Sequence, residues 1–254
     1  MAALKRECLL DRLLMPGALR AEFQPVYHVA GMVSPVHYLE GLLRGPRGTN
    51  AERPEVLFIY ARRKHAEVAL DRAAVRTVLL AAREIRNVSL GVNVHAATLA
   101  SDLDFLPFLG DALTESGVAP ERVVLELVEH GHVWDRHALH LNLDALRHIG
   151  VRMALDDFGT GEANYLMFLE CRPEYLKIDR YFNHGCHLDP RRQAMLDSLA
   201  GLAACVGTRV VAEGVEDPAD LQRVRSAGIE LAQGFLLGRP GPAASWPPPG
   251  RVCA

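Results

Sequence analysis

The 254-residue sequence predicts an α/β fold, a modified (β/α)8 barrel, on three observations. About eight short apolar runs are spread along the chain, and segments with helical periodicity lie between the later ones. A chain of this length is long enough for one such barrel. Only VAGMVSP separates the first two runs, which is too short for a crossover helix, so these two strands are expected to pair antiparallel.

The expected strands are short runs rich in Val, Leu and Ile, taken here in chain order: Phe23–His28, Val36–Leu42, Leu90–Val94, Val123–Leu127, Val151–Leu155, Tyr175–Ile178, Val210–Ala212 and Ala232–Leu236. Apolar stripes at steps of three and four predict helices between them, over 70–85, 139–149 and 195–206. Gly150 and Gly207 then supply helix stops, and Asp217 before Pro218 is typical of an N-cap that opens a helix through Val224. A doubly wound open sheet is the structural alternative, but no GxGxxG follows any of these strands.

The chain divides into a helical lead-in over residues 1–20, a barrel over 21–240 and a proline-rich tail over 241–254. Charged residues interrupt the first twenty positions, so a signal peptide is not expected, and no apolar run is long enough to cross a bilayer. Five cysteines, an odd number without a CxxC, indicate reduced thiols and a cytoplasmic location. A net charge of -3 argues against wrapping duplex nucleic acid, while a small anionic ligand stays open.

Polar side chains occur near the end of almost every expected strand. They are Glu40, Asn93, Glu126 with Glu129, Asp156 with Asp157, Lys177 with Asp179, Glu213 with Glu216, and Gln233. Because the C-terminal ends of barrel strands meet at one mouth, most of these oxygen ligands should converge there. Carboxylates packed so closely either share protons or bind hard cations, and with no thiolate or imidazole among them Mg²⁺ or Mn²⁺ suits them better than Zn²⁺.

Any single acid in this set is more often a helix cap or a salt-bridge partner than a metal ligand, and we interpret Glu216 and Asp179 in that way. The histidines of the stretches 130–140 and 184–187 lack metal-ligand spacing and are interpreted as surface groups. Cys171 and Cys205 are interpreted as packing residues.

Eight segments in fixed order carry a resemblance to a known family: FQPV, EGLLRGP, VNVHAATL, LELVE, DDFGTG, YLKID, VAEGVE and QGFLLGRP. From Phe23 to Pro240 the chain resembles the EAL-domain cyclic di-GMP phosphodiesterases. The resemblance implies a modified TIM barrel with an antiparallel first strand. It also implies hydrolysis of cyclic di-GMP to linear pGpG with two Mg²⁺ or Mn²⁺ ions, a chemistry in which paired cations polarise the phosphoryl oxygen and lower the pKa of a water.

Carried over by position, the resemblance implies a first metal held by Glu40, Asn93, Glu126 and Asp156. Asp156 would bridge to the second metal, which Asp157 and Glu213 would help to hold. Lys177 would lie beside the attacking water, and Gln233 would support the site by hydrogen bonds. Arg44 would contact a phosphate, Gln24 would lie near the ligand, and Glu129 would brace the loop that begins at DFGTG.

The chain departs from the family in two places. The signature tripeptide reads Glu-Gly-Leu instead of Glu-Ala-Leu, so Gly41 should cost some strand rigidity and packing. After DFGTG the family usually has an aromatic residue and two serines, whereas this chain has Glu162, Ala163 and Asn164. That loop is linked in the family to ordering of the metal site and to dimer-mediated control.

Two functions therefore compete. The matched metal positions favour an active phosphodiesterase, and the altered loop favours a catalytically silent receptor that binds cyclic di-GMP and signals through a partner. A scaffold that no longer binds nucleotide is disfavoured by the intact Arg44 and carboxylates. The sequence shows no sensor or cyclase segment, so regulation is expected from a protein partner, from a homodimer or from expression.

Overall fold

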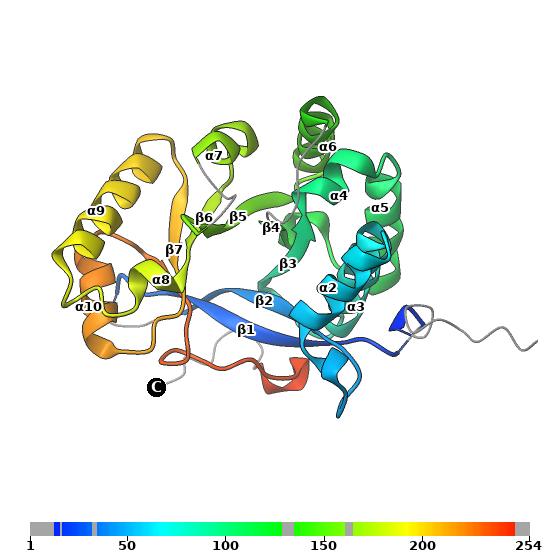
Figure 1. The fold of residues 1–254 in the computed structure, drawn as a ribbon, viewed down its shortest axis with the longest axis horizontal. Helices are drawn as coiled ribbons and strands as arrows, with labels where there is room; N and C mark the ends of the chain where they lie inside the picture. The colour runs from blue at the N-terminus through cyan, green and yellow to red at the C-terminus, as the bar shows by residue number, and fades with distance from the viewer. Residues whose placement is uncertain (1–12, 16, 32–34, 129–134, 161–164, 247–254) are drawn as a thin grey trace, which may run out of the picture.

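The computed structural model describes residues 13–246, except residue 16 and the segments 32–34, 129–134 and 161–164. Within these residues the strands close into a barrel in sequence order. Figure 1 labels β1 to β7 along it. Their bounds are β1 Arg20–His28, β2 Val36–Arg44, β3 Ser89–His95, β4 Val123–Val128, β5 Arg152–Phe158, β6 Tyr175–Ile178, β7 Arg209–Ala212 and β8 Leu231–Ala232. The expected (β/α)8 barrel is confirmed.

The strand β1 is antiparallel to both of its neighbours, β2 and β8, and every other adjacent pair is parallel. The prediction of an antiparallel hairpin from the short VAGMVSP connection is therefore confirmed. This register sets Gln24 directly opposite Glu40 and Asn93 directly opposite Glu126. The polar residues of successive strands are thereby brought to the same level of the barrel.

Helices surround the barrel in Figure 1, with α9 and α10 on one side and α2, α3 and α5 on the other. Their bounds are α2 Pro54–Arg63, α3 Glu67–Ala81, α4 Ala96–Ser101, α5 Phe105–Ser116, α6 Arg136–His148, α7 Tyr165–Cys171, α8 Arg180–Asn183, α9 Pro190–Cys205 and α10 Pro218–Ser226. The predicted N-cap is confirmed, because the Asp217 carboxylate accepts a hydrogen bond from the Ala219 amide at the start of α10. Gly150 follows α6 with a positive φ of 94°, as a helix stop requires.

The last strand was predicted over Ala232–Leu236, but it spans Leu231–Ala232, so only Ala232 of the predicted residues belongs to it. The chain leaves β8 at Ala232 and turns at once, since the amides of Leu237 and Gly238 both donate to the Gly234 carbonyl. A methyl group at Gly234 would lie 2.1 Å from the Val215 carbonyl oxygen, so only glycine fits where this turn passes the loop after β7. The turn keeps Gln233 at the mouth of the barrel.

Most of the apolar core lies between the barrel and its helices. A smaller cluster fills the inside of the barrel, with Val26, Tyr38, Val124, Ala154, Tyr175, Val211 and Leu231. Cys171 is buried, as expected for a packing residue, but Cys205 is exposed at the end of α9, so the packing interpretation was wrong there. His187 is also not a plain surface group, because its Nδ1 bonds the buried carboxylate of Asp220 at 2.6 Å.

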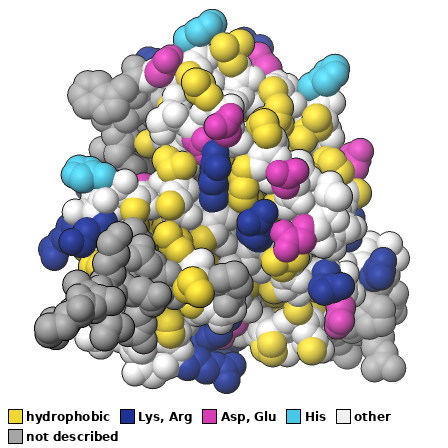
Figure 2. Space-filling model, turned by 90° about the vertical axis from the view of Figure 1, so that its right-hand side faces the viewer, with side chains coloured by type: hydrophobic (Ala, Val, Ile, Leu, Met, Phe, Trp, Pro, Cys, Tyr) yellow, Lys and Arg dark blue, Asp and Glu magenta, His cyan; other side chains and the backbone are white. Residues whose placement is uncertain are grey.

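The expected lead-in helix over residues 1–20 falls largely outside the described residues, and Arg20 already belongs to β1. In the tail, Gly241 forms two backbone hydrogen bonds with Phe23 of β1, and Ala243–Ser245 forms a 3-10 turn. None of the described helices combines the length and apolar character that a bilayer crossing requires. Acidic, basic and apolar side chains are interleaved on the face of the molecule that Figure 2 shows.

Candidate functional site

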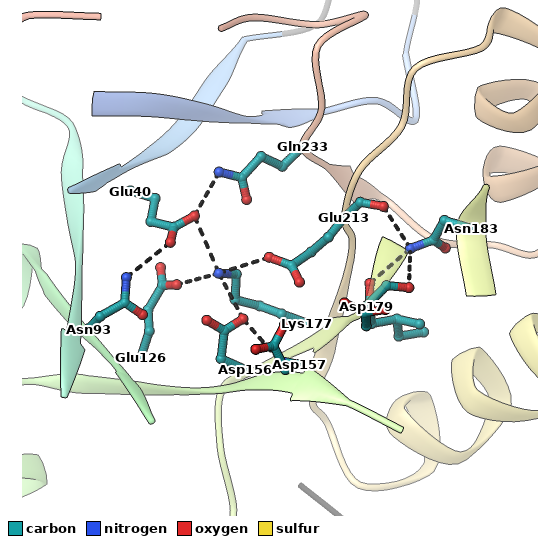
Figure 3. A network of polar contacts seen from close by, with 11 residues as sticks. Glu40, Asn93, Glu126, Asp156, Asp157, Lys177, Asp179, Asn183, Glu213 and Gln233 are labelled. Atoms are coloured by element: carbon teal, nitrogen blue, oxygen red, sulfur yellow. Dashed lines mark hydrogen bonds and ion pairs between the residues drawn. The ribbon is translucent and has the colours of Figure 1, made fainter. Parts of the chain in front are cut away.

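Eight of the polar residues predicted near the strand ends converge at the C-terminal mouth of the barrel, and Figure 3 shows how they lie. Glu40, Asn93, Glu126 and Lys177 come from β2, β3, β4 and β6, and Asp156 and Asp157 come from β5. Glu213 and Gln233 follow β7 and β8 directly. The side chains of Glu40, Glu126, Asp156, Lys177 and Gln233 are buried, and those of Asn93, Asp157 and Glu213 are half-buried.

Lys177 lies at the centre of this cluster, with its side chain only 1% exposed. Its Nζ is 2.5 Å from Glu126 Oε2 and 2.9 Å from both Asp156 Oδ1 and Glu213 Oε1. The fourth carboxylate, Glu40, is 3.3 Å away. A single ammonium group therefore balances part of the negative charge that four strands bring together.

Glu40 is fixed by two amide side chains. Asn93 Nδ2 donates to Glu40 Oε1 at 3.0 Å, and Gln233 Nε2 donates to Glu40 Oε2 at 2.7 Å. These bonds settle the orientation of both amides, because each nitrogen faces Glu40 and each oxygen is left facing elsewhere in the site. The predicted supporting role of Gln233 thus has a physical basis, a hydrogen bond to a buried carboxylate.

The adjacent acids Asp156 and Asp157 both reach the site because β5 is irregular at this point. In a regular strand, neighbouring side chains point to opposite faces. Here the pairing of β5 with β6 shifts register between Leu155 and Phe158, and Asp157 has a φ of +52°. This left-handed conformation costs a non-glycine residue about 1–3 kcal/mol, and such strain concentrates at functional sites.

Burial and mutual repulsion control protonation in the cluster. Burial raises the pKa values of Glu126, Asp156 and Glu213 above their ordinary values, with repulsion among the carboxylates adding to it and Lys177 opposing it. For Asp157, burial and then repulsion from Asp156 raise the pKa to about 6.

Glu40 and Lys177 shift in the opposite direction to these acids. Burial would raise the pKa of Glu40, but the charge of Lys177 and the hydrogen bonds from Gln233 and Asn93 together hold it below its usual value. Burial likewise opposes charge on Lys177, yet the surrounding carboxylates raise its pKa well above the usual value. Lys177 is therefore a firmly charged ammonium group.

The site fits a pair of hard divalent cations. Ligand oxygens of Glu40, Glu126 and Asp156 lie within 4.8 Å of one another, and so do those of Asp156, Asp157 and Glu213. The two triads share Asp156. Among the buried oxygens without a hydrogen-bond partner are one each from three residues of this cluster: Asn93 Oδ1, Glu126 Oε1 and Gln233 Oε1. Unpartnered buried acceptors are costly unless a ligand completes them, and an all-oxygen set matches Mg²⁺ or Mn²⁺.

Two residues that shape the site were not predicted from the sequence. A methyl group at Gly91 would lie 2.1 Å from Glu126 Oε1, so the absent side chain makes room for that carboxylate. Asn183 is fully buried and its Nδ2 donates to the carbonyls of Ile178 and Glu213 at 2.8 and 2.9 Å. Gly91 could have been noticed, because a glycine inside a strand such as LGVNV often marks a close approach by another group. No feature of the sequence indicated a role for Asn183.

The remaining predicted residues have varied surroundings. Gln24 donates to the Gly238 carbonyl at 3.0 Å, and Arg44 forms an ion pair with Glu22 at 3.0 Å, so their expected contacts with a ligand stay predictions. Asp179 caps α8 and Glu216 pairs with Arg180, as interpreted from the sequence. Glu129 and the triplet Glu162, Ala163 and Asn164 lie outside the described residues.

Two cavities open beside the carboxylates. The larger, about 420 Å³, lies between α2 and the ends of β2 and β3, and its walls are mainly apolar, with Leu43, Phe58 and Ile59. The smaller, about 270 Å³, lies on the side of the loops after β7 and β8 and includes Gln24 and Phe235. Asp157 lines both cavities, so the acidic centre lies between them.

Comparisons with known proteins agree with this geometry. A profile described as "EAL domain" matches residues 8–240. The cyclic di-GMP phosphodiesterase RocR of Pseudomonas aeruginosa is 35% identical over 157 residues, which is 61% of this chain and 39% of that protein. The cyclic di-GMP phosphodiesterase NbdA of the same organism is 29% identical over 249 residues, which is 95% of this chain but 31% of NbdA. The chain thus spans well under half the length of these relatives.

A solved structure also has the same fold over most of the chain. The structure titled "PaMucR Phosphodiesterase, c-di-GMP complex" matches with a TM-score of 0.80 and 26% identity, covering 93% of this chain and 97% of that one.

Proposed function

The chain belongs to the EAL domain family, and on that premise we propose that it is a metal-dependent phosphodiesterase that hydrolyses cyclic di-GMP to linear pGpG. The observation that carries the proposal is the pair of acidic triads that share Asp156. Two oxygen-lined positions with one bridging carboxylate are what a two-cation hydrolytic centre requires. Asn93, whose amide nitrogen bonds Glu40 of the first triad, has an unpartnered oxygen that would add a further ligand.

We assign the first cation to Glu40, Asn93, Glu126 and Asp156, and the second to Asp156, Asp157 and Glu213, with Mg²⁺ or Mn²⁺ as the ions. When bound, such a pair supplies Lewis acidity to the phosphoryl oxygen and lowers the pKa of the attacking water. Every other part of the chemistry is assigned to side chains that the chain itself provides.

Lys177 contributes a fixed positive charge beside the reacting phosphate and orients the attacking water. In the metal-free protein the surrounding carboxylates raise its pKa well above the usual value, and we assign it a role by charge and hydrogen bonding. Gln233 holds Glu40 in one orientation, and Asn183 fixes the backbone at Glu213. These contacts keep the oxygens in place before the substrate arrives, which reduces the reorganisation needed in the transition state.

The ligand would lie across the mouth with one base on each side. The apolar walls of the larger cavity suit a purine ring. At the smaller cavity Phe235 is 47% exposed and the Arg239 guanidinium lies 4.2 Å from its ring centroid, so the second base would contact this aromatic and cationic pair. Gln24 would lie near the ligand. Arg44 would have to turn from Glu22 to reach a phosphate, and its charge suits that role.

A catalytically silent receptor for cyclic di-GMP is the second candidate, favoured by Glu162, Ala163 and Asn164 in the loop after DFGTG. An added carboxylate there would repel the ligand phosphates or Glu129. A homodimer or a regulatory protein would then carry the signal, and in either case we place the protein in the cytoplasm.

One experiment separates the two candidates. The protein is incubated with cyclic di-GMP and either Mg²⁺ or Mn²⁺, with a chelator as the control, and the products are separated by chromatography. Appearance of pGpG only with metal supports the enzyme. Binding of cyclic di-GMP by calorimetry without any pGpG would reject the enzyme and support the receptor.

A further inference from the structure

Lys177 touches both of the acidic triads at once. Its Nζ contacts Glu40, Glu126 and Asp156 of the first triad, and Asp156 and Glu213 of the second, all within 3.3 Å. The ammonium therefore occupies the space between the oxygens to which we assign the two cations. In Figure 3 the dashed lines from these carboxylates meet at its nitrogen.

This arrangement does not satisfy every carboxylate. An ammonium group has three hydrogens to donate, and four carboxylates surround it. With Asp157 included, the cluster has five carboxylates and one ammonium group, which leaves a net charge of about −4 when all are ionised. Two divalent cations would neutralise this net charge. Lys177 is thus a partial substitute for the cations that the oxygens can hold.

The choice of lysine at this position is itself informative. The chain has only three lysines, Lys5, Lys64 and Lys177, against 25 arginines, yet the most enclosed of its described cationic positions carries a lysine. A compact ammonium on a flexible stem can move between several oxygens, whereas a planar guanidinium is suited to one bidentate partner. Lysine is the residue that can balance the carboxylates and then withdraw from them.

We propose that Lys177 is the internal counter-cation of the metal-free barrel, and that divalent cations bind by displacing its ammonium group from the carboxylates. This inference rests on the proposed function, since it takes the two triads as the metal sites. It adds that Lys177 weakens the affinity for metal, because each cation must compete for oxygens that Lys177 already holds and then remain near a like charge. By linkage, cation binding frees the ammonium from these oxygens.

The test compares Mn²⁺ binding by calorimetry at one fixed, mildly alkaline pH in four proteins. They are the wild type, Lys177→Met, Lys177→Gln and the control Lys64→Met, which removes an exposed lysine at the end of α2. Loss of the ammonium should tighten Mn²⁺ binding by about tenfold or more, since a unit charge a few ångströms from a cation is a large term even when partly screened. Lys64→Met should bind Mn²⁺ as the wild type does.

Thermal unfolding in a chelator gives a second readout that does not depend on activity. Without metal, both Lys177 variants should melt below the wild type, and saturating Mn²⁺ should raise their melting temperatures more than it raises that of the wild type. Wild-type protein with labelled lysine ε-carbons offers a test without mutation. Addition of Mg²⁺ should shift the Lys177 resonance and leave that of Lys64 unchanged.

The outcomes distinguish failure of the displacement by cations from failure of the proposed metal site. Equal or weaker Mn²⁺ binding in the Lys177 variants, with normal binding in the wild type, overturns the displacement and leaves the metal site standing. A Lys177 resonance that does not respond to Mg²⁺ at saturation has the same meaning. Absence of Mn²⁺ binding in all four proteins would overturn the proposed function and this inference with it.

Discussion

Gly41 follows Glu40 in β2, and Val78 of α3 fills the space beside it. A methyl group at Gly41 would lie 2.2 Å from Val78 Cγ1 and 3.1 Å from Cγ2, where carbon atoms normally approach to about 3.5–4.0 Å. Val78 is 2% exposed and, as a β-branched residue in a helix, has one strongly preferred rotamer. The side chain therefore cannot rotate away cheaply, and the helix or the strand must move by about 1 Å.

Gly41→Ala restores the family's Glu-Ala-Leu tripeptide, yet we expect it to destabilise this protein. Replacement of a strand glycine by alanine would gain about 0.5–1 kcal/mol from the unfolded chain. Overpacking against Val78 should outweigh that gain, because inserted carbons in a filled core cost about 1–3 kcal/mol. Val78→Ala alone should cost about 2 kcal/mol from two lost methyl groups and the cavity they leave.

The two changes should compensate each other. In the double variant the new methyl group enters the space that Val78 vacates, so the loss of unfolding free energy should be smaller than the sum of the single losses by about 1 kcal/mol or more. Urea unfolding followed by circular dichroism measures all four proteins. Gly201→Ala is the matched control, since no atom lies within 4 Å of its new methyl group and a helical glycine gains about 1 kcal/mol as alanine. Strict additivity, or a Gly41→Ala protein as stable as the wild type, would refute this account of the packing.

Four further expectations concern the site and its surroundings. Glu40→Ala should abolish pGpG formation by removing a ligand of the first cation, and an unchanged rate would contradict that assignment. Replacement of residues 162–164 by an aromatic residue and two serines should raise turnover, and no rise would mean that the departure is harmless. Gly91→Ala should displace the Glu126 carboxylate by about 1 Å and lower kcat/KM by about 100-fold in the pGpG assay. A variant with the kcat/KM of the wild type would show that Gly91 does not position this carboxylate. Burial and nearby arginines lower the pKa of His37 from 6.5 to about 4. Between these pH values the unfolded chain binds a proton that the folded protein does not, so the free energy of unfolding should fall as the pH falls from 6.5 to about 4. Urea unfolding across this pH range should show a smaller fall for His37→Gln than for the wild type, and an equal fall would contradict the shift.

Hydrophobic patterning was sufficient for most of the fold. The strand expected over Tyr175–Ile178 has those bounds in the structure, where all four of its residues, Lys177 included, are buried. The run Ala232–Leu236 is also short and mainly apolar, but the chain turns after Ala232, where Gly234 passes the backbone of Val215. A contact between two loops distant in sequence decided the outcome, and an apolar pattern of five residues cannot encode it.

The acids of the site were predictable because the C-terminal ends of parallel barrel strands must share one mouth. Their environment was less predictable. The resemblance implied a place for Lys177 beside the attacking water, which stays a prediction, but nothing in the sequence indicated that four carboxylates would surround its ammonium group. Distances between side chains from different strands depend on register and on small residues such as Gly91, and neither can be read from a strand taken alone.

The adjacent aspartates of β5 show why a local rule fails at such a site. Alternation would send either Asp156 or Asp157 away from the mouth, leaving one triad without its member. The register shift and the left-handed Asp157 bring both carboxylates inward, at a cost in backbone strain and in repulsion between them. Burial, and then repulsion from Asp156, raise the pKa of Asp157 to about 6. In the proposed metal-bound state, cations between the triads would offset the repulsion between the two carboxylates, so this repulsion would favour the metal-bound state over the metal-free one.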